Sequence, residues 1–193
     1  MGHVVKRLGA GALLALAAAG ASGQAFDPAP MIAAQREAMK PLAAMNGLWR
    51  GDATVMLPNG ERRTVTQTER IGHFLGGTLK IIEGRGYDSN GKLAFSAFGI
   101  VSFNPATQSY SLRSYAHGRQ GDFPFNPTAD GYTWDVPAGP GAIIRYTATI
   151  AGSRLREVGD RIVGSEAPTR VFEMTLERIG DTDWPEGGAI GPR

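Results

Sequence analysis

The spacing of hydrophobic and polar residues changes once along this chain, near Leu48. Before that point, residues 29–45 are rich in helix-forming residues, and apolar side chains recur every three to four positions. The recurring residues are Met31, Ala34, Ala38 and Leu42. This spacing places them on one stripe of a helix. Pro41 should kink or end that helix, and Asn46-Gly47 is typical of a stop.

From Leu48 onward, apolar and polar residues alternate in short runs that end in turn-forming residues, which is the pattern of β-strands. The predicted strands are residues 48–57, 61–74, 77–87, 92–103, 108–117, 119–125, 131–136, 142–150, 153–163 and 169–179. No stretch between them is long enough for a helical crossover, so the connections should be antiparallel hairpins. A sheet this large tends to curl and remove its edges by closing. We therefore predict an all-β fold, a single antiparallel meander closed into a barrel of about eight to ten strands, with a sandwich as the alternative.

The first 25 residues have the organisation of a secretory signal peptide. Lys6 and Arg7 give a positively charged start, residues 8–19 are uncharged, and small residues follow. The uncharged run is shorter than the roughly 20 residues that span a bilayer, so a cleaved signal is preferred to an uncut anchor. Cleavage before Gln24 or Phe26 would place the mature protein in the periplasm or outside the cell, with no membrane span.

The predicted organisation of the chain follows from these patterns. It comprises a signal peptide at 1–25, a helix and linker at 26–45, a barrel domain at 46–180 and a flexible tail at 181–193. The tail is polar and rich in Gly and Pro, and we expect it on the surface, with Trp184 as the residue that could pack against the barrel.

Charge and composition exclude several functions. The 193 residues include 20 basic and 18 acidic ones, and loss of Lys6 and Arg7 would make the two numbers equal. No basic cluster remains that could bind a phosphate backbone, so nucleic acid is not an expected partner. The chain has no cysteine, which excludes disulfides, thiolate nucleophiles and Cys-based zinc sites. The sequence leaves the oligomeric state open.

The start of the first predicted strand, Gly47-Leu48-Trp49-Arg50-Gly51, resembles the lipocalin and fatty-acid-binding superfamily. A longer ordered set within residues 45–180 resembles the bacterial lipocalin-like (calycin-type) barrels grouped as domain of unknown function 1579 and its neighbours. Its segments are QTER (67–70), LGGT (75–78), IEGRG (82–86), NPAT (104–107), LRSY (112–115), IRYT (144–147), EVG (157–159) and FEMTL (172–176). The resemblance implies a barrel in an exported or cell-envelope setting. It implies no established activity or site.

Neither a haem nor a metal site is expected. Haem barrels that handle nitric oxide share the Gly-x-Trp-x-Gly opening, but this chain departs from them at Ala53 and has no histidine on its last strands. His73 and His117 are the histidines left after cleavage, and their spacing matches no metal motif. We predict no cofactor, no metal and no recognised catalytic set.

Polar residues on apolar strand faces are the candidates for a ligand site. Gln67 and Glu69 alternate with Val65 and Ile71, Glu83 alternates with Leu79 and Ile81, and Glu157 follows Leu155 in the same way. Arg113 and Tyr115 resemble the Arg-x-Tyr carboxylate clamp of fatty-acid-binding barrels, and an arginine can bind a carboxylate through two bonds. The predicted site residues are Gln67, Glu69, Glu83, Arg113 and Tyr115 as one interior polar zone, with Trp49 and Phe172 as apolar wall.

Two other interpretations of this polar set stay open. It could be a solvated outer face, or a structural ion network at the barrel floor with Trp49 over an arginine. The leading functional hypothesis is non-enzymatic binding or carrying of a small, partly apolar ligand that could bear a carboxylate. The alternatives are an enzyme with Glu69 or Glu83 as general base and Arg113 as oxyanion partner, or a structural envelope protein without a ligand. The sequence does not decide whether catalysis occurs.

Overall fold

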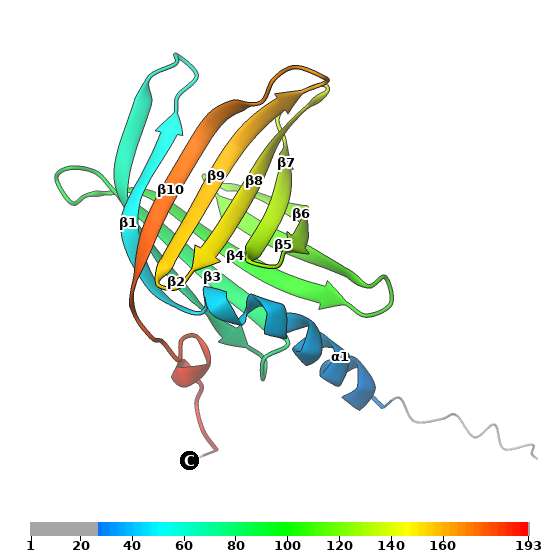
Figure 1. Cartoon of the computed structure of the whole chain (residues 1–193). Helices are drawn as coiled ribbons and strands as arrows, with labels where there is room; N and C mark the ends of the chain where they lie inside the picture. Colours follow the sequence, from blue (N-terminus) through cyan, green and yellow to red (C-terminus); the bar gives the residue numbers. More distant parts are fainter. Residues whose placement is uncertain (1–26, 193) are drawn as a thin grey trace, which may run out of the picture.

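The structure, a computed structural model, describes residues 27–192. Ten antiparallel strands close into one barrel, in which each strand pairs with its neighbours in sequence and β1 pairs with β10 (Figure 1). The strands are β1 (Gly47–Met56), β2 (Arg62–Phe74), β3 (Leu79–Tyr87), β4 (Leu93–Asn104), β5 (Ser109–Ala116), β6 (Arg119–Pro127), β7 (Gly131–Pro137), β8 (Ala142–Ala151), β9 (Arg154–Val163) and β10 (Thr169–Gly180). The predicted all-β meander with one N-terminal helix is confirmed.

Short turns connect the strands, and glycine or asparagine lies in several of them, as the sequence predicted. Between β1 and β2, Gly60 has a φ of 84°, which a side chain would disfavour, and its N–H donates to the Leu57 carbonyl at 2.9 Å. Between β3 and β4, the Asp88 carboxylate accepts bonds from the backbone N–H groups of Asn90 and Lys92. These local bonds set the hairpins, and the hairpins set the antiparallel order.

The N-terminal helical segment closes one end of the barrel. α1 (Ala29–Met39) continues directly into the 3-10 helix η1 (Lys40–Met45), because Pro41 has no N–H to continue the α-helical bonds. In Figure 1 both elements lie across the lower end of the barrel. Met39, Leu42 and Met45 are each 1% exposed. The first turn differs from the predicted apolar stripe, because Met31 is exposed where α1 extends beyond the barrel.

The interior next to this plug is solidly packed. Trp49 is buried at the floor, and its indole N–H donates to the Met45 carbonyl at 2.9 Å. The Arg178 guanidinium lies 5.7 Å from the centre of the Trp49 ring. Other fully enclosed side chains around it are Ile71, Val101, Phe125, Leu155 and Leu176. The helical plug and this layer form the main hydrophobic core.

The opposite end of the barrel is less enclosed. Val55, on the inward-facing side of β1, is 40% exposed. Val65, Phe123, Tyr146 and Phe172 face the same interior and are half-buried. No helix among residues 27–192 covers this end (Figure 1). One half of the barrel is therefore a filled core, and the other half opens to solvent.

The segment after β10 crosses the outer face of β2. A Cβ on Gly72 would collide with the carbonyl oxygen of Trp184, so only glycine permits this approach. The backbone N–H of Gly76 donates to the carboxylate of Glu186 at 2.5 Å, and Glu186 is the first residue of the short 3-10 helix η2 (Glu186–Gly188). Within the described residues, no helix combines the length and apolar character needed to cross a membrane.

We expect the plug to contribute a large part of the stability. Leu42→Ala should lower the free energy of unfolding by about 2–5 kcal/mol, because it removes a fully buried side chain and leaves a cavity. The matched control is Leu93→Ala, which alters a side chain that is 50% exposed and should change stability by less than about 0.5 kcal/mol. Urea denaturation followed by circular dichroism measures both. Equal midpoints for the two variants would mean that η1 does not seal the barrel.

Candidate functional site

Gln67 and Glu69 lie inside the barrel, where alternation along β2 predicted them. In the strand register, Gln67 is opposite Gly51 and Glu69 is opposite Trp49. Gln67 is 4% exposed, and its amide donates to Glu69 Oε1 at 2.7 Å. Glu69 is half-buried, on the inward-facing side of β2.

Glu157 brings a second carboxyl group to the interior, from β9. It is 8% exposed, and its Oε1 accepts a hydrogen bond of 2.8 Å from the Trp134 indole N–H. Trp134 stacks on Tyr146 with ring centres 4.3 Å apart, and Tyr146 meets the edge of Phe172 at 5.7 Å. The carboxyl group of Glu157 is thus held at one end of a row of three aromatic rings.

Burial changes the acidity of both carboxyl groups. Desolvation raises the pKa of Glu69 from 4.5 to about 8; the bond from Gln67 opposes this rise, and the charges of Glu157 and Glu83 add to it. Desolvation also raises the pKa of Glu157 to about 7, against the bond from Trp134. Near neutral pH, Glu69 therefore holds its proton and Glu157 is partly protonated.

Several polar atoms in this interior have no partner. The described hydrogen bonds use one oxygen of Glu69 and one of Glu157. None of them uses the hydroxyl of Tyr132, which is 6% exposed. Burial raises the pKa of Tyr132 well above its ordinary value, and the charges of Glu157 and Glu69 raise it further. These groups form an interior polar site with unused hydrogen-bonding capacity.

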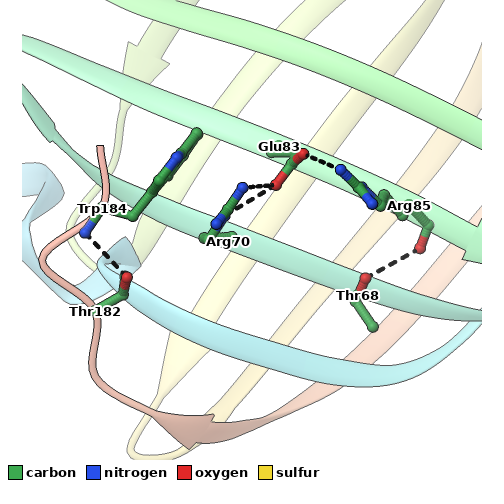
Figure 2. A network of polar contacts seen from close by, with 6 residues as sticks. All are labelled: Thr68, Arg70, Glu83, Arg85, Thr182 and Trp184. Carbon is green, nitrogen blue, oxygen red and sulfur yellow. Dashed lines mark hydrogen bonds and ion pairs between the residues drawn. The ribbon is translucent and has the colours of Figure 1, made fainter. Parts of the chain in front are cut away.

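Glu83 does not belong to this interior site, and that part of the predicted zone is wrong. It faces outward from β3 and pairs with Arg70 at 2.6 Å and with Arg85 at 2.7 Å (Figure 2). The guanidinium of Arg70 also lies 4.2 Å from the centre of the Trp184 ring. The inward positions next to Glu83 are Ile82 and Gly84. The polar network of Figure 2 is thus an outer-face ion network.

Arg113 and Tyr115 also face outward, so the predicted carboxylate clamp is not present in the interior. Arg113 forms a two-pronged ion pair with Asp122, with N–O distances of 2.9 and 2.7 Å, and both side chains are more than half exposed. Tyr115 lies beside Phe98, also on the outer face. The inward residues of β5 include Leu112 and Ser114. An exposed pair of this kind is screened by solvent and contributes little to stability.

The two predicted wall residues do face inward, although at different depths. Trp49 forms the closed floor and Phe172 lies in the open half. The list of predicted site residues left out Glu157, although alternation with Leu155 had marked it as a candidate, and it left out the aromatic residues Tyr132, Trp134 and Tyr146. Alternation along β7, β8 and β9 could have identified all four as inward-facing, since each lies two residues from another inward-facing residue.

A separate buried polar cluster lies at the plugged end. Lys80 is fully buried, and its ammonium group donates to the Asn46 side-chain oxygen. The Asn46 amide in turn contacts His73 Nε2 at 2.8 Å. Burial lowers the pKa of Lys80 to about 8. Within residues 27–192, no group of His, Asp or Glu side chains has the arrangement needed to hold a metal ion.

These features define a calycin-like β-barrel, a closed antiparallel meander with a helical plug at one end and an open half at the other. The crystal structure of Rv2717c from M. tuberculosis has a similar fold, with a TM-score of 0.55 and 13% sequence identity. The similarity covers 73% of this chain and 96% of that one. No protein-family model and no curated protein sequence matches this chain. The likeness to Rv2717c establishes the fold alone.

The raised pKa values predict that the interior carboxyl groups make stability depend on pH. Between pH 4.5 and the raised values, the folded state holds protons that the unfolded state has lost, so stability falls as the pH rises. The double variant Glu69→Gln/Glu157→Gln has neither carboxyl group, so its stability does not fall with pH for this reason. Its free energy of unfolding relative to wild type should rise by more than about 2 kcal/mol from about pH 5 to 8.5, since one pKa unit corresponds to about 1.4 kcal/mol.

Urea midpoints measured across this pH range test the prediction. Glu177→Gln is the control, because Glu177 lies on the outer face beside Arg154 and is half exposed. His73 and Lys80 are present in every protein compared, so their own titrations cancel in the difference. A difference that does not change with pH would show that the two interior carboxyl groups have ordinary pKa values.

Proposed function

We propose that this barrel binds and carries a small, partly apolar molecule in its open half. The observation that carries the proposal is the arrangement of inward-facing aromatic side chains, half-exposed at the open end, above buried polar groups with unused hydrogen-bonding capacity. Binding sites for small molecules combine mostly apolar walls with a few placed polar groups in this way. Phe172 and Tyr146 would contact the apolar part of the ligand, and Glu69 and Glu157 its polar part.

Binding without chemistry is favoured over catalysis by the positions of the candidate residues. The enzymatic alternative needs Glu69 or Glu83 to act together with Arg113. Glu69 faces the interior, whereas Glu83 and Arg113 face outward and already pair with other residues. The purely structural alternative needs a filled core, but the open half contains half-exposed apolar residues and partly unpaired carboxyl groups.

We further propose that the protein is exported after cleavage before Gln24 or Phe26, and that it is related to the calycin-type barrels of domain of unknown function 1579. Support for both comes from the sequence: the signal-like organisation of the N-terminus and the ordered segments that resemble that family. The signal segment lies outside the residues that the structure describes.

The ligand site is tested by narrowing the open end. Val55→Trp adds a large side chain where Val55 faces the interior beside Phe172. It should weaken binding of N-phenyl-1-naphthylamine, an uncharged fluorescent probe, by at least about tenfold, which corresponds to about 1.4 kcal/mol. Native mass spectrometry of protein purified without denaturation should also detect a retained small molecule in wild type and less of it in this variant.

Thr54→Trp is the matched control, because Thr54 lies one position along the same strand on the outer face, where its hydroxyl bonds that of Thr64. It should bind the probe as wild type does. Equal losses in the two variants would place the probe outside the barrel. Absence of probe binding and of any retained molecule in wild type would overturn the proposed function.

Export is tested by the mass of the protein recovered from its native cell. We expect an intact mass that matches a chain beginning at Gln24 or Phe26, recovered from the periplasm or the medium. Mass spectrometry of fractionated cells measures this. A full-length product confined to the cytosol would contradict the proposal.

A further inference from the structure

We infer that the polar end of the ligand is a nitrogen cation, such as a protonated amine, bound between Glu69 and Glu157 with its apolar body against Trp134, Tyr146 and Phe172. This inference rests on the proposed function and names the class of ligand. It reverses the expectation of a carboxylate ligand, which depended on Arg113 facing inward.

The charges in the interior favour a cation. Glu69 and Glu157 enter from different strands, and each has one oxygen without a described partner. The groups whose interactions shift the pKa of Glu69 are Gln67, Glu157 and Glu83, and none of them is a cation. At short range in a partly desolvated site, an ammonium group would attract both carboxyl groups, and a carboxylate ligand would be repelled.

The inward-facing cations of the described residues are engaged elsewhere or lie apart from this site. Lys80 on β3 is bound to Asn46 at the plugged end. Arg178 on β10 lies over Trp49 and pairs with Asp181 at 2.5 Å. Arg63, opposite Val55 on β2, and Arg119 and Arg161, near strand ends on β6 and β9, are exposed. None of these cations appears among the causes that shift the pKa of Glu69 or Glu157.

A second observation that points to a ligand is the hydroxyl of Tyr132. The side chain is more than nine-tenths buried, and none of the described hydrogen bonds uses its hydroxyl, although the charges of Glu69 and Glu157 act on it. A donor-rich ligand group between the carboxyl groups could supply the missing partner for this oxygen.

Backbone geometry on β3 makes room for the carboxyl group. A Cβ on Gly84 would lie 2.8 Å from Glu69 Oε1 and 3.1 Å from Gln67 Nε2. Glycine at this inward position therefore lets the Gln67–Glu69 pair lie flat against β3. The same strand carries Gly86 at its next inward position, where the Gln67 Oε1 would lie 3.2 Å from a Cβ.

The aromatic row suits the same class of ligand. Trp134 and Tyr146 stack with an angle of 12° between their rings, and Phe172 presents a further ring to Tyr146. Aromatic faces attract cations as well as apolar surface. An amine with a flat or branched apolar body could therefore place both its charge and its apolar part against these aromatic rings.

The protonation of Glu69 and Glu157 makes the expected affinity for an ammonium ligand depend on pH. In the free barrel near neutral pH, Glu69 holds its proton and Glu157 is partly protonated, because burial raises their pKa values to about 8 and about 7. A bound ammonium group favours the ionised carboxylates and so releases protons. Affinity should rise from about pH 6 to 8.5, while a primary amine with a pKa of about 10 stays protonated. Tyr132 and Tyr146 stay neutral over this range, because burial raises the pKa of both hydroxyl groups.

The experiment compares three indoles of similar size by calorimetry at pH 8: tryptamine, which is cationic; indole-3-propionate, which is anionic; and 3-ethylindole, which is neutral. Tryptamine should bind at least about tenfold tighter than indole-3-propionate, a difference of about 1.4 kcal/mol. Glu157→Gln and Glu69→Gln should each weaken tryptamine at least tenfold and leave 3-ethylindole within about twofold. Glu177→Gln, on the outer face, should bind tryptamine as wild type does.

The outcomes separate this inference from the proposed function. If indole-3-propionate binds as tightly as tryptamine, or if the Gln variants leave tryptamine unchanged, the cation inference is overturned and the ligand site stands. If no indole binds but N-phenyl-1-naphthylamine does, the inference is also overturned. If nothing binds and no molecule is retained, both fail. Because the Gln variants are close in shape to Glu, urea midpoints at pH 8 check that each is folded, and the pH dependence of tryptamine binding in wild type tests the inference without any variant.

Discussion

Pairing of the first strand with the last is the constraint on which the rest of this structure depends. β1 bonds to β10 on one side and to β2 on the other, and Trp49 lies at this seam. Its indole bonds Met45 of the plug, and its ring lies below Arg178 of β10. Because side chains alternate along a strand, closing the ring fixes one inward face for every strand at once. The positions of Glu69 and Glu157 follow from that closure.

Local chemistry explains why the strands could be predicted so closely. Turns such as Asn59-Gly60 depend on a few neighbouring residues, so their effect is readable in the sequence. The inward face of β2 was also predictable, since Val65 and Ile71 flank Gln67 and Glu69 at two-residue spacing. The transition from α1 to η1 at Pro41 is another local effect. Each of these features needs no knowledge of distant contacts.

Whether a side chain points into or out of the barrel was not predictable where distant segments cover the outside of the barrel. Ile81 faces outward on β3 yet is 4% exposed, and it pairs with Gly72, which lies under the C-terminal segment. In the sequence, the outer face of β3 is therefore the more apolar one, while its inner face carries Gly84 and Gly86 in place of large residues. A prediction from alternation then places Glu83 on the inner face, although it lies on the outer face. Arg113 and Tyr115 were misplaced for a different reason, because their resemblance to an Arg-x-Tyr clamp was given more weight than the alternation. Tyr110, Leu112 and Ala116 mark the opposite face of β5 as the inner one.

The contrast between the two acidic settings favours a site over a structural network inside the barrel. Glu83, outside, has two arginine partners and is a complete ion network. Glu69, inside, has one amide partner and no cation, an arrangement that costs stability when the carboxyl group ionises. Apolar residues of similar volume usually serve a core at least as well as buried charges, and the plugged half of this barrel is built from such residues. The open half instead keeps two carboxyl groups and a glycine that makes room for one of them. This costly arrangement is better explained by a group that enters from outside than by the needs of the fold.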